Sequence, residues 1–296
     1  MHRLLRIFIN EDRRKGQVLV VIWGVHSPGW MAALKPSAPV WKKIPRVGAV
    51  INRSSRLRGI PWGALLGRRV VVIPLMEKHI LWRPKRYPAL VGSVDAIDIL
   101  CNKMRFAAYA GQQELSHLCP QTYPSVEEAE FPCVIKRADL SGGMGIQIAE
   151  TLERARHLLS YVPFAGSAYI VQECVPFLEE YVAHCVCVKG RVVWGVVYSY
   201  GFEQHEIRRD GTRYKLGRRE LPREVLEALE AFLAPLDYSG PCNADYVFRA
   251  NGRLVIFEIN PRLGGSLMFP QNVEDLAACL EVLIEETGKL PAVSVR

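Results

Sequence analysis

The residues best suited to do chemistry lie in one short stretch, 242–262, with the sequence CNADYVFRANGRLVIFEINPR. Its dipeptide Asn251-Gly252 is the strongest short-range signal for a β-hairpin. If these two residues form the turn, Ala250 pairs with Arg253, and this pairing fixes the partner of every other residue in both strands. The stretch therefore predicts a two-stranded ribbon with a defined register.

That register predicts a polar face on the ribbon. Asp245 falls directly opposite Glu258, and Asn243 falls opposite Asn260. Because successive side chains of a strand point to opposite faces, all four lie on one face. The other face is expected to be apolar and to consist of Tyr246, Phe248, Phe257 and Ile259.

The two facing carboxylates indicate a bound cation. Directly opposed Cβ atoms lie about 5 Å apart, so Asp245 and Glu258 repel each other unless something offsets their charge. A hard divalent cation does so, and Mg²⁺ prefers carboxylate and amide oxygens and completes its shell with water and nucleotide phosphates. The alternative is a solvent-exposed strand face with ordinary polar residues.

Other segments contain the parts that a nucleotide site needs. The glycine-rich loop SGGMG, residues 141–145, follows a strand that contains Lys136. Glycines let backbone N–H groups approach phosphate oxygens, and a nearby lysine adds positive charge. The loop matches neither a Walker A sequence nor a dinucleotide fingerprint, and alone it is more typical of a plain turn. Glu173 ends an apolar strand and Glu180 begins the next, and each alone is typical of a surface carboxylate.

Strands and helices alternate along the chain, with several antiparallel hairpins, which indicates an α/β or α+β protein with at least two subdomains. Two apolar runs, 18–25 and 70–74, are typical of buried strands in a parallel sheet. Residues 35–69 between them predict only loops and one helix. Further strands are predicted at 131–136, 168–172, 181–188, 191–198 and in the hairpin 242–260, and helices at 95–118, 151–159, 222–233 and 274–287.

The order of these parts is more specific than any one of them. Along the chain come Asn102-Lys103 at a helix start, FPCVIKR, SGGMGI, YIVQECV with Glu-Tyr seven residues on, and Asp…Glu-Ile-Asn-Pro-Arg. In this order they resemble the ATP-grasp superfamily, especially its carboxylate–amine ligase and carbamoyl-phosphate-synthase-like branches. The similar part covers roughly residues 95–290.

The resemblance implies the ATP-grasp fold, an α/β (α+β) architecture in which two subdomains grip ATP. Residues 1–94 would then form a small pre-ATP-grasp α/β domain. Residues 95–180 would form the small subdomain with the glycine-rich loop, and residues 181–296 the large subdomain with the metal hairpin.

The resemblance also implies roles for individual residues in binding ATP. The residues that would contact ATP are Lys103, Lys136, Ser141, Gly142, Gly143, Gly145, Glu173, Val175 and Glu180. The lysines and the loop would meet the phosphates, and the backbone of Val175 would meet the edge of the adenine ring. Glu173 would accept from the adenine amino group, and Glu180 would bind the ribose hydroxyls.

The metal and the reacting group have implied residues of their own. Asp245, Glu258 and Asn260 would hold one or two Mg²⁺ ions, or Mn²⁺ in their place. Arg262 and Lys136 would be the catalytic residues. Arg262 would steady the transferred phosphoryl group or the substrate carboxylate.

The implied function is that of an ATP-dependent ligase. It would activate a small carboxylic acid, such as an amino acid, as an acyl phosphate for attack by an amine, with release of ADP and phosphate. The chain departs from the family pattern at Asn102, where Asp is common, and at Cys174, but neither change removes a metal ligand. Two alternatives stay open: an ATP-grasp kinase that phosphorylates a hydroxyl, and a non-catalytic binder of nucleotides or nucleic acid.

Charge is distributed unevenly in this chain, whose net charge is +8. Residues 1–100 hold 18 Lys and Arg against 5 Asp and Glu, so they carry +13 and residues 101–296 carry −5. A basic segment that also holds five of the six Trp is one feature of nucleic-acid binders. The sequence has no zinc finger, RNP-type strand or helix-turn-helix spacing, so a solvated basic face or a pocket for an anionic substrate is favoured.

Composition and apolar runs are typical of a soluble globular protein. The longest apolar run, 18–25, is far shorter than the roughly 20 residues that span a membrane. Eight cysteines without CxxC spacing suit buried free thiols in a reducing compartment better than disulfides or a zinc site. We therefore expect a cytoplasmic enzyme with small-molecule carboxylate and amine substrates and no membrane or nucleic-acid partner, as a monomer or a homodimer.

Overall fold

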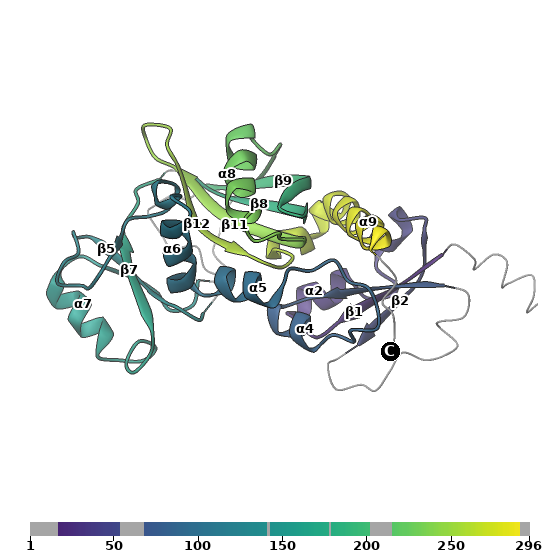
Figure 1. The fold of residues 1–296 in the computed structure, drawn as a ribbon, viewed down its shortest axis with the longest axis horizontal. Helices are drawn as coiled ribbons and strands as arrows, with labels where there is room; N and C mark the ends of the chain where they lie inside the picture. The colour runs from purple at the N-terminus through teal and green to yellow at the C-terminus, as the bar shows by residue number, and fades with distance from the viewer. Residues whose placement is uncertain (1–16, 54–67, 141–142, 178, 202–214, 291–296) are drawn as a thin grey trace, which may run out of the picture.

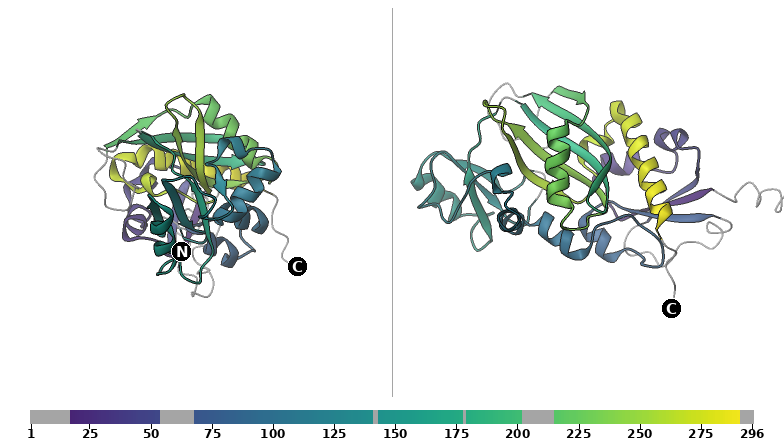
Figure 2. Two further views of the ribbon diagram at one scale, coloured as in Figure 1. Left: turned by 90° about the vertical axis from the view of Figure 1, so that its left-hand side faces the viewer. Right: turned by 45° about the horizontal axis from the view of Figure 1, so that its top comes forward.

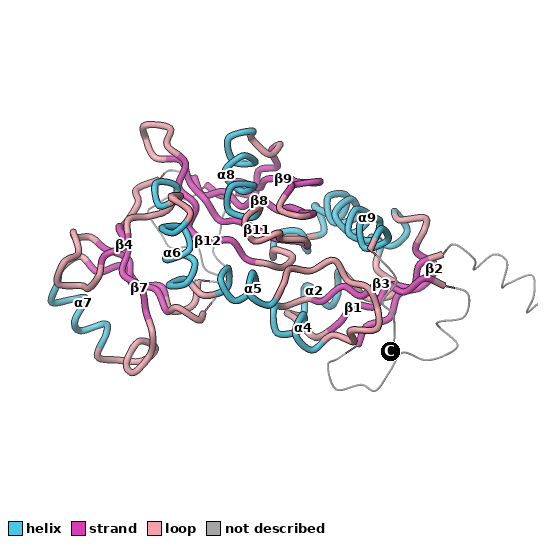
Figure 3. The backbone as a smooth tube through the Cα atoms, in the orientation of Figure 1, coloured by secondary structure: helices cyan, strands magenta, loops and turns pink. Residues whose placement is uncertain are grey.

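The computed structural model describes residues 17–53, 68–140, 143–177, 179–201 and 215–290. Within these residues three β-sheets follow one another along the long axis of the molecule (Figure 1). Helical segments lie between and beside the three groups of strands (Figure 3). The predicted mixed α/β architecture is confirmed.

The first sheet is parallel, with strand order β2-β1-β3. Its strands are β1 (Val18–Trp23), β2 (Val47–Arg53) and β3 (Arg69–Pro74). Every residue of β1 is buried, as expected for the central strand of a covered parallel sheet. The sequence does not predict β2, because VGAVINR contains a glycine and is only partly buried. Short helices flank this sheet: α2 (Pro28–Ala33), η1 (Pro39–Lys43) and α4 (Glu77–Trp82).

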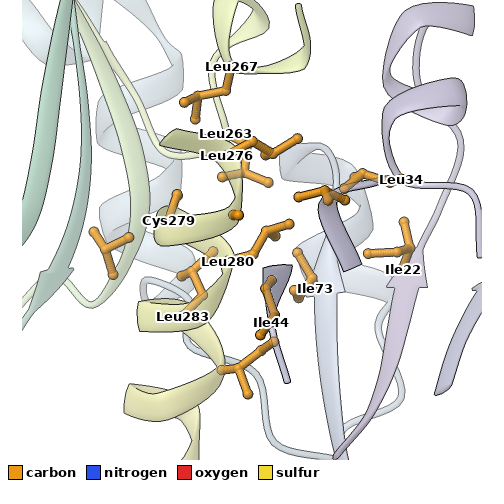
Figure 4. Close-up of a cluster of buried hydrophobic side chains, with 14 of the residues drawn as sticks. Ile22, Leu34, Ile44, Ile73, Leu263, Leu267, Leu276, Cys279, Leu280 and Leu283 are labelled. Atoms are coloured by element: carbon orange, nitrogen blue, oxygen red, sulfur yellow. The ribbon is translucent and has the colours of Figure 1, made fainter. Parts of the chain in front are cut away.

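One hydrophobic core joins the first sheet to the C-terminal helix α9 (Val273–Lys289). In it Ile73 of β3 lies near Leu280 of α9 (Figure 4). Leu263 and Leu267, from the segment that follows Asn-Pro-Arg, belong to the same core. Burying one such side chain fully stabilises the fold by about 1.5–3 kcal/mol. The first sheet is therefore packed firmly against the C-terminal part of the chain.

The second sheet is antiparallel, with strand order β4-β7-β5-β6. Its strands are β4 (Thr122–Tyr123), β5 (Cys133–Arg137), β6 (Ile146–Ala149) and β7 (Tyr169–Glu173). Helix α7 (Leu152–Leu159) packs its apolar side chains against the sheet and forms a small separate core with it.

The third sheet is antiparallel, with strand order β10-β9-β8-β11-β12. Its strands are β8 (Glu179–Val188), β9 (Arg191–Gly201), β10 (Lys215–Arg219), β11 (Gly240–Phe248) and β12 (Leu254–Asn260). The helices α5 (Val94–Cys101), α6 (Lys103–Gln112) and α8 (Arg223–Leu233) share a core with this sheet. Figure 2 shows α8 lying across the sheet. Short 3-10 turns complete the described elements: η2 (Ser116–Leu118), η3 (Gly265–Met268) and η4 (Pro270–Asn272).

The helix predicted at 95–118 is broken at Asn102. This residue has extended backbone angles, and its Oδ1 accepts from the N–H groups of Met104 and Arg105 at 3.0 and 3.1 Å. A capping side chain ends one helix and starts the next, since it satisfies N–H groups that have no partner within the helix. Lys103 therefore opens α6, as predicted, but the prediction of one continuous helix is wrong.

The hairpin of β11 and β12 has the predicted pairing at its polar residues. Asp245 pairs with Glu258, and Asn243 pairs with Asn260. Two deviations from an ideal two-residue hairpin produce this register, and they cancel each other.

The first deviation is in the turn. Gly252 donates to the carbonyl of Arg249, and Arg249 donates to the carbonyl of Arg253. The loop thus has three residues, with Gly252 at a φ of 81°, in place of the two predicted. The predicted pairing of Ala250 with Arg253 is wrong.

The second deviation is a β-bulge. Tyr246 pairs with Ile256 while its neighbour Asp245 pairs with Glu258, so Phe257 is an extra residue in β12. The bulge places Phe257 beside a cluster of valines, away from Tyr246. The prediction that Phe257 belongs to the apolar face with Tyr246 is therefore wrong.

All eight cysteines are free, and six of them are buried, as predicted. No helix in the described part of the chain is long and apolar enough to cross a membrane.

Replacing the cap residue tests this description of the fold. We expect Asn102→Ala to lower the free energy of unfolding by about 1 kcal/mol, because α6 loses its capping oxygen, and Asn102→Asp to leave it nearly unchanged. Chemical denaturation followed by circular dichroism measures the difference. Thr151→Ala is a matched control, since Thr151 caps α7 in the same way far from Lys103. Equal stability of wild type and Asn102→Ala would contradict the capping role.

Candidate active site

The charged side chains selected from the sequence come together where the second and third sheets meet. Lys136 lies on β5, and Lys103 is the first residue of α6. Glu258 and Asn260 lie at the end of β12, and Arg262 follows directly. Segments far apart in the sequence therefore supply one cluster of charges.

Lys103 connects the hairpin to the loop that follows β5. Its ammonium lies 3.2 Å from Glu258 Oε2 and donates to the carbonyl oxygen of Leu140 at 2.5 Å. Its backbone N–H also donates to the carbonyl of Ala138 at 3.1 Å. The start of α6 thus holds the loop and the hairpin in a fixed relation.

Lys136 is the most deeply buried cation of the cluster, with 8% of its surface exposed. Its ammonium lies 5.1 Å from the centre of the Phe257 ring. The pKa of Lys136 is lowered to about 8, mainly by burial and in part by the charge of Lys103, while Glu258 and Glu180 oppose the shift. The bulge that reorients Phe257 therefore builds one wall around this lysine.

Glu258 stays ionised in spite of its burial. Burial alone raises the pKa of this carboxyl, but Lys103, the amide of Asn260 and Lys136 outweigh it and hold the pKa at about 2. The positive charge that balances Glu258 was expected to come from a metal ion. Lys103 and Lys136 supply part of it. A carboxylate that remains charged at every ordinary pH is suited to bind a cation.

The oxygen donors of the hairpin fit a hard divalent cation. Asn260 Nδ2 donates to Glu258 Oε1 at 2.9 Å, and Asn260 Oδ1 lies on the side of Arg262. Asp245 is the cross-strand partner of Glu258. No cluster of three His, Cys, Asp or Glu suited to a metal occurs in the described residues. Two carboxylates and an amide are nevertheless the donor types that Mg²⁺ takes when phosphate oxygens and water complete its shell.

The linker between β7 and β8 borders an apolar patch beside this cluster. Val175 is buried there with Val247 and Val255. The rings of Phe177 and Phe257 lie 6.0 Å apart and pack against these valines. Apolar and aromatic side chains of this kind commonly line the sites that bind flat rings.

The two glutamates predicted to bind adenine and ribose have different surroundings. Glu173 forms an ion pair with Arg249 and accepts from the backbone N–H of Gln121 at 2.9 Å. Glu180 is buried at the start of β8, close enough to Lys136 to raise its pKa. The predicted roles of both residues toward the nucleotide stay predictions.

The glycine-rich loop connects β5 to β6. Gly143 and Gly145 have φ angles of 73° and 65°, a region in which side chains with a Cβ are strained. A Cβ at Gly145 would also lie 2.7 Å from the side chain of Arg137. Ser141 and Gly142, which were predicted to bind phosphate, lie outside the described residues.

Sequence reasoning missed Glu77, the first residue of α4. Its Oε1 accepts from Arg262 Nε at 2.7 Å. An isolated glutamate in a short helix carries no signal of such a contact, because the pairing depends on how the first sheet packs against the third.

Cys101 lies next to the cluster but is not a nucleophile. The pKa of its thiol is raised to about 12, mainly by burial and in part by Glu77 and Glu258, while Arg262 and Lys103 oppose the shift. The thiol therefore stays protonated, and reactivity requires the thiolate. The lysines and Arg262 of this cluster carry the charge needed to neutralise and orient a polyphosphate.

Solved structures share this arrangement of sheets and helices across most of the chain. D-alanine–D-alanine ligase from Bacillus anthracis complexed with ATP matches 93% of this chain and 98% of its own, with a TM-score of 0.63 and 14% identity. L-amino acid ligase from Bacillus licheniformis matches 92% of this chain and 75% of its own, with a TM-score of 0.58 and 13% identity.

A third similar structure is D-cycloserine synthetase DcsG, which matches 91% of this chain and 99% of its own, with a TM-score of 0.60 and 15% identity. No protein-family profile and no curated protein sequence matches the chain. The resemblance inferred from the order of motifs is confirmed at the level of structure. The chain has the fold of the ATP-grasp enzymes.

Proposed function

We propose that this protein is an ATP-dependent ligase that joins a small carboxylic acid to an amine. The observation that carries the proposal is the buried cluster of Lys103, Lys136 and Glu258 between two sheets. Such a cluster is costly to bury unless charged ligands enter it. Mg·ATP supplies both a cation for Glu258 and phosphates for the lysines.

The preference for a ligase over a kinase comes from the structural neighbours. D-alanine–D-alanine ligase and L-amino acid ligase are named for joining two amino acids, and both match nearly the whole of this chain. We extend this to the present protein as a proposal, with a small carboxylate and an amine as substrates in the cytoplasm. We likewise retain the division into residues 1–94, 95–180 and 181–296.

In the proposed reaction the substrate carboxylate attacks the γ-phosphorus of ATP, and the bond between that phosphorus and the β–γ bridging oxygen breaks. ADP leaves, and an acyl phosphate remains. An amine then attacks the acyl carbon, the C–O bond to phosphate breaks, and the amine loses a proton as the amide forms. Across the two steps, a P–O bond of ATP and a C–O bond of the carboxylate are broken, and a new P–O bond and a C–N bond are formed.

The protein contributes position and charge to this reaction. Lys103, Lys136 and Arg262 would neutralise charge on the phosphates and hold the reactants in line. Asp245, Glu258 and Asn260 would hold Mg²⁺, which supplies further neutralisation of the phosphate oxygens when bound. Val175 and its apolar neighbours would receive the adenine ring.

Trapping the acyl phosphate tests the proposal. With Mg·ATP, a panel of amino acids and other small carboxylates, and hydroxylamine as the amine, we expect ADP release together with a hydroxamate. Lys103→Met should lower this rate about a hundredfold or more, because it removes a buried charge from the phosphate site. Lys289→Met is the matched control, since this exposed lysine lies at the far end of α9.

The outcomes separate the three functions. ADP release that requires an alcohol and yields no hydroxamate would indicate a kinase. Absence of ADP release with every acceptor, together with a salt-dependent shift on an oligonucleotide, would indicate a binder. Either result would refute the ligase.

The lowered pKa of Lys136 predicts a pH dependence of nucleotide binding. Below pH 8 the ammonium is charged and attracts phosphate, and above its pKa of about 8 it loses its proton. We expect the Kd for Mg·ATP to rise about tenfold between about pH 8 and pH 9.5 in the wild type. Isothermal titration over this range measures the change.

Lys136→Arg provides the reference for this titration. A guanidinium keeps its charge throughout the range, so we expect its affinity for Mg·ATP to be nearly independent of pH. A rise in Kd of the same size in wild type and Lys136→Arg would assign the pH dependence to another group.

A further inference from the structure

The ion pair between Glu77 and Arg262 joins the helix after the first sheet to the segment after the third sheet's strand β12. Glu77 opens α4, which follows the first sheet, and Arg262 follows β12 of the third sheet. Arg262 Nε donates to Glu77 Oε1 at 2.7 Å across 185 positions of sequence. Glu77 thereby brings a carboxylate from the helix after the first sheet to a predicted catalytic residue.

The pair is shielded from solvent. Only 12% of the Arg262 side chain and 22% of the Glu77 side chain are exposed. A charge-assisted hydrogen bond in such surroundings is stronger and more directional than an ion pair at the surface. The contact therefore constrains the orientation of the guanidinium.

The contact with Glu77 uses Nε of Arg262, so the Nη1 and Nη2 groups at the outer end of the guanidinium can bind other acceptors. Its Nη1 and Nη2 groups reach the carbonyl of Leu263 and Oδ1 of Asn260, each at 3.4 Å. These hydrogen bonds are long and can be replaced by those of a better acceptor. Nε is held by Glu77, and Nη2 lies beside Asn260, a predicted metal ligand.

The base that carries Glu77 is rigid. Leu75, two residues before Glu77, lies in the same hydrophobic core as Leu263, the residue after Arg262. Each end of the ion pair is thus close in sequence to a residue of this core, and Figure 4 shows Leu263 within it.

We propose that Glu77 is a positioning residue for phosphoryl transfer. It holds Arg262 by Nε, so that both Nη groups face the phosphoryl group that moves from ATP to the substrate. The first sheet thereby contributes to the reaction through one carboxylate, although it supplies none of the predicted ATP ligands. The inference rests on the proposed function and adds a role that the sequence did not predict.

A mimic of the transferring phosphoryl group tests this role. Isothermal titration compares the affinity for Mg·ADP alone with that for Mg·ADP plus aluminium fluoride. In the wild type we expect aluminium fluoride to increase the affinity for Mg·ADP. In Glu77→Gln we expect the Kd for Mg·ADP to change less than about twofold and the gain from fluoride to fall about tenfold.

Four further variants complete the experiment. Glu77→Asp keeps the charge and should retain more of the fluoride gain than Glu77→Gln. The double variant Glu77→Gln/Arg262→Ala should lose no more of the fluoride-dependent gain in affinity than Arg262→Ala alone. The reason is that Glu77 acts through the guanidinium of Arg262. Glu274→Gln removes the ion pair with Lys43, which joins the N-terminal region to α9, and should change neither affinity.

The outcomes of this titration distinguish failure of the positioning role of Glu77 from failure of the proposed function. An unchanged fluoride gain in Glu77→Gln, or an equal loss of affinity for Mg·ADP and for the fluoride complex, would overturn the positioning role alone. A wild type that binds Mg·ADP but gains nothing from fluoride would also overturn it and leave nucleotide binding standing. A wild type that binds no Mg·ADP would overturn the proposed function as well. Thermal unfolding confirms that each variant is folded.

Discussion

The buried ion pair between Lys103 and Glu258 is the contact on which the site depends. It joins the start of α6 to the end of β12, and through Leu140 it also fixes the loop after β5. Losing one partner would leave an uncompensated charge in a buried place, which is strongly destabilising. The acidic and the basic side chains of this cluster thus lie side by side, and each stabilises the charge of the other.

The polar face of the hairpin could be predicted from the sequence because strand register is set by local residues. Asp245 and Glu258 are paired as the period of two requires. The route to this pairing differs, since a longer turn and the bulge at Phe257 compensate each other. A bulge has no clear sequence signature, and its consequence for Lys136, whose ammonium lies over the Phe257 ring, could not be foreseen.

What the sequence did not show depends on contacts between distant segments. Glu77 becomes part of the site only because the first sheet packs against α9 and the segment after β12. β2 lacks an apolar run and is stabilised by pairing with β1. Asn102 interrupts a helical pattern through one side-chain oxygen. In each case tertiary contacts or a single hydrogen bond override the local pattern.

The central claim is that the face of Asp245 and Glu258 binds Mg²⁺ together with the nucleotide. Isothermal titration of ATP into the wild type and into Glu258→Gln, with and without Mg²⁺, tests it directly. We expect Mg²⁺ to tighten ATP binding to the wild type and Glu258→Gln to lose this effect. An equal effect of Mg²⁺ on both proteins would contradict it.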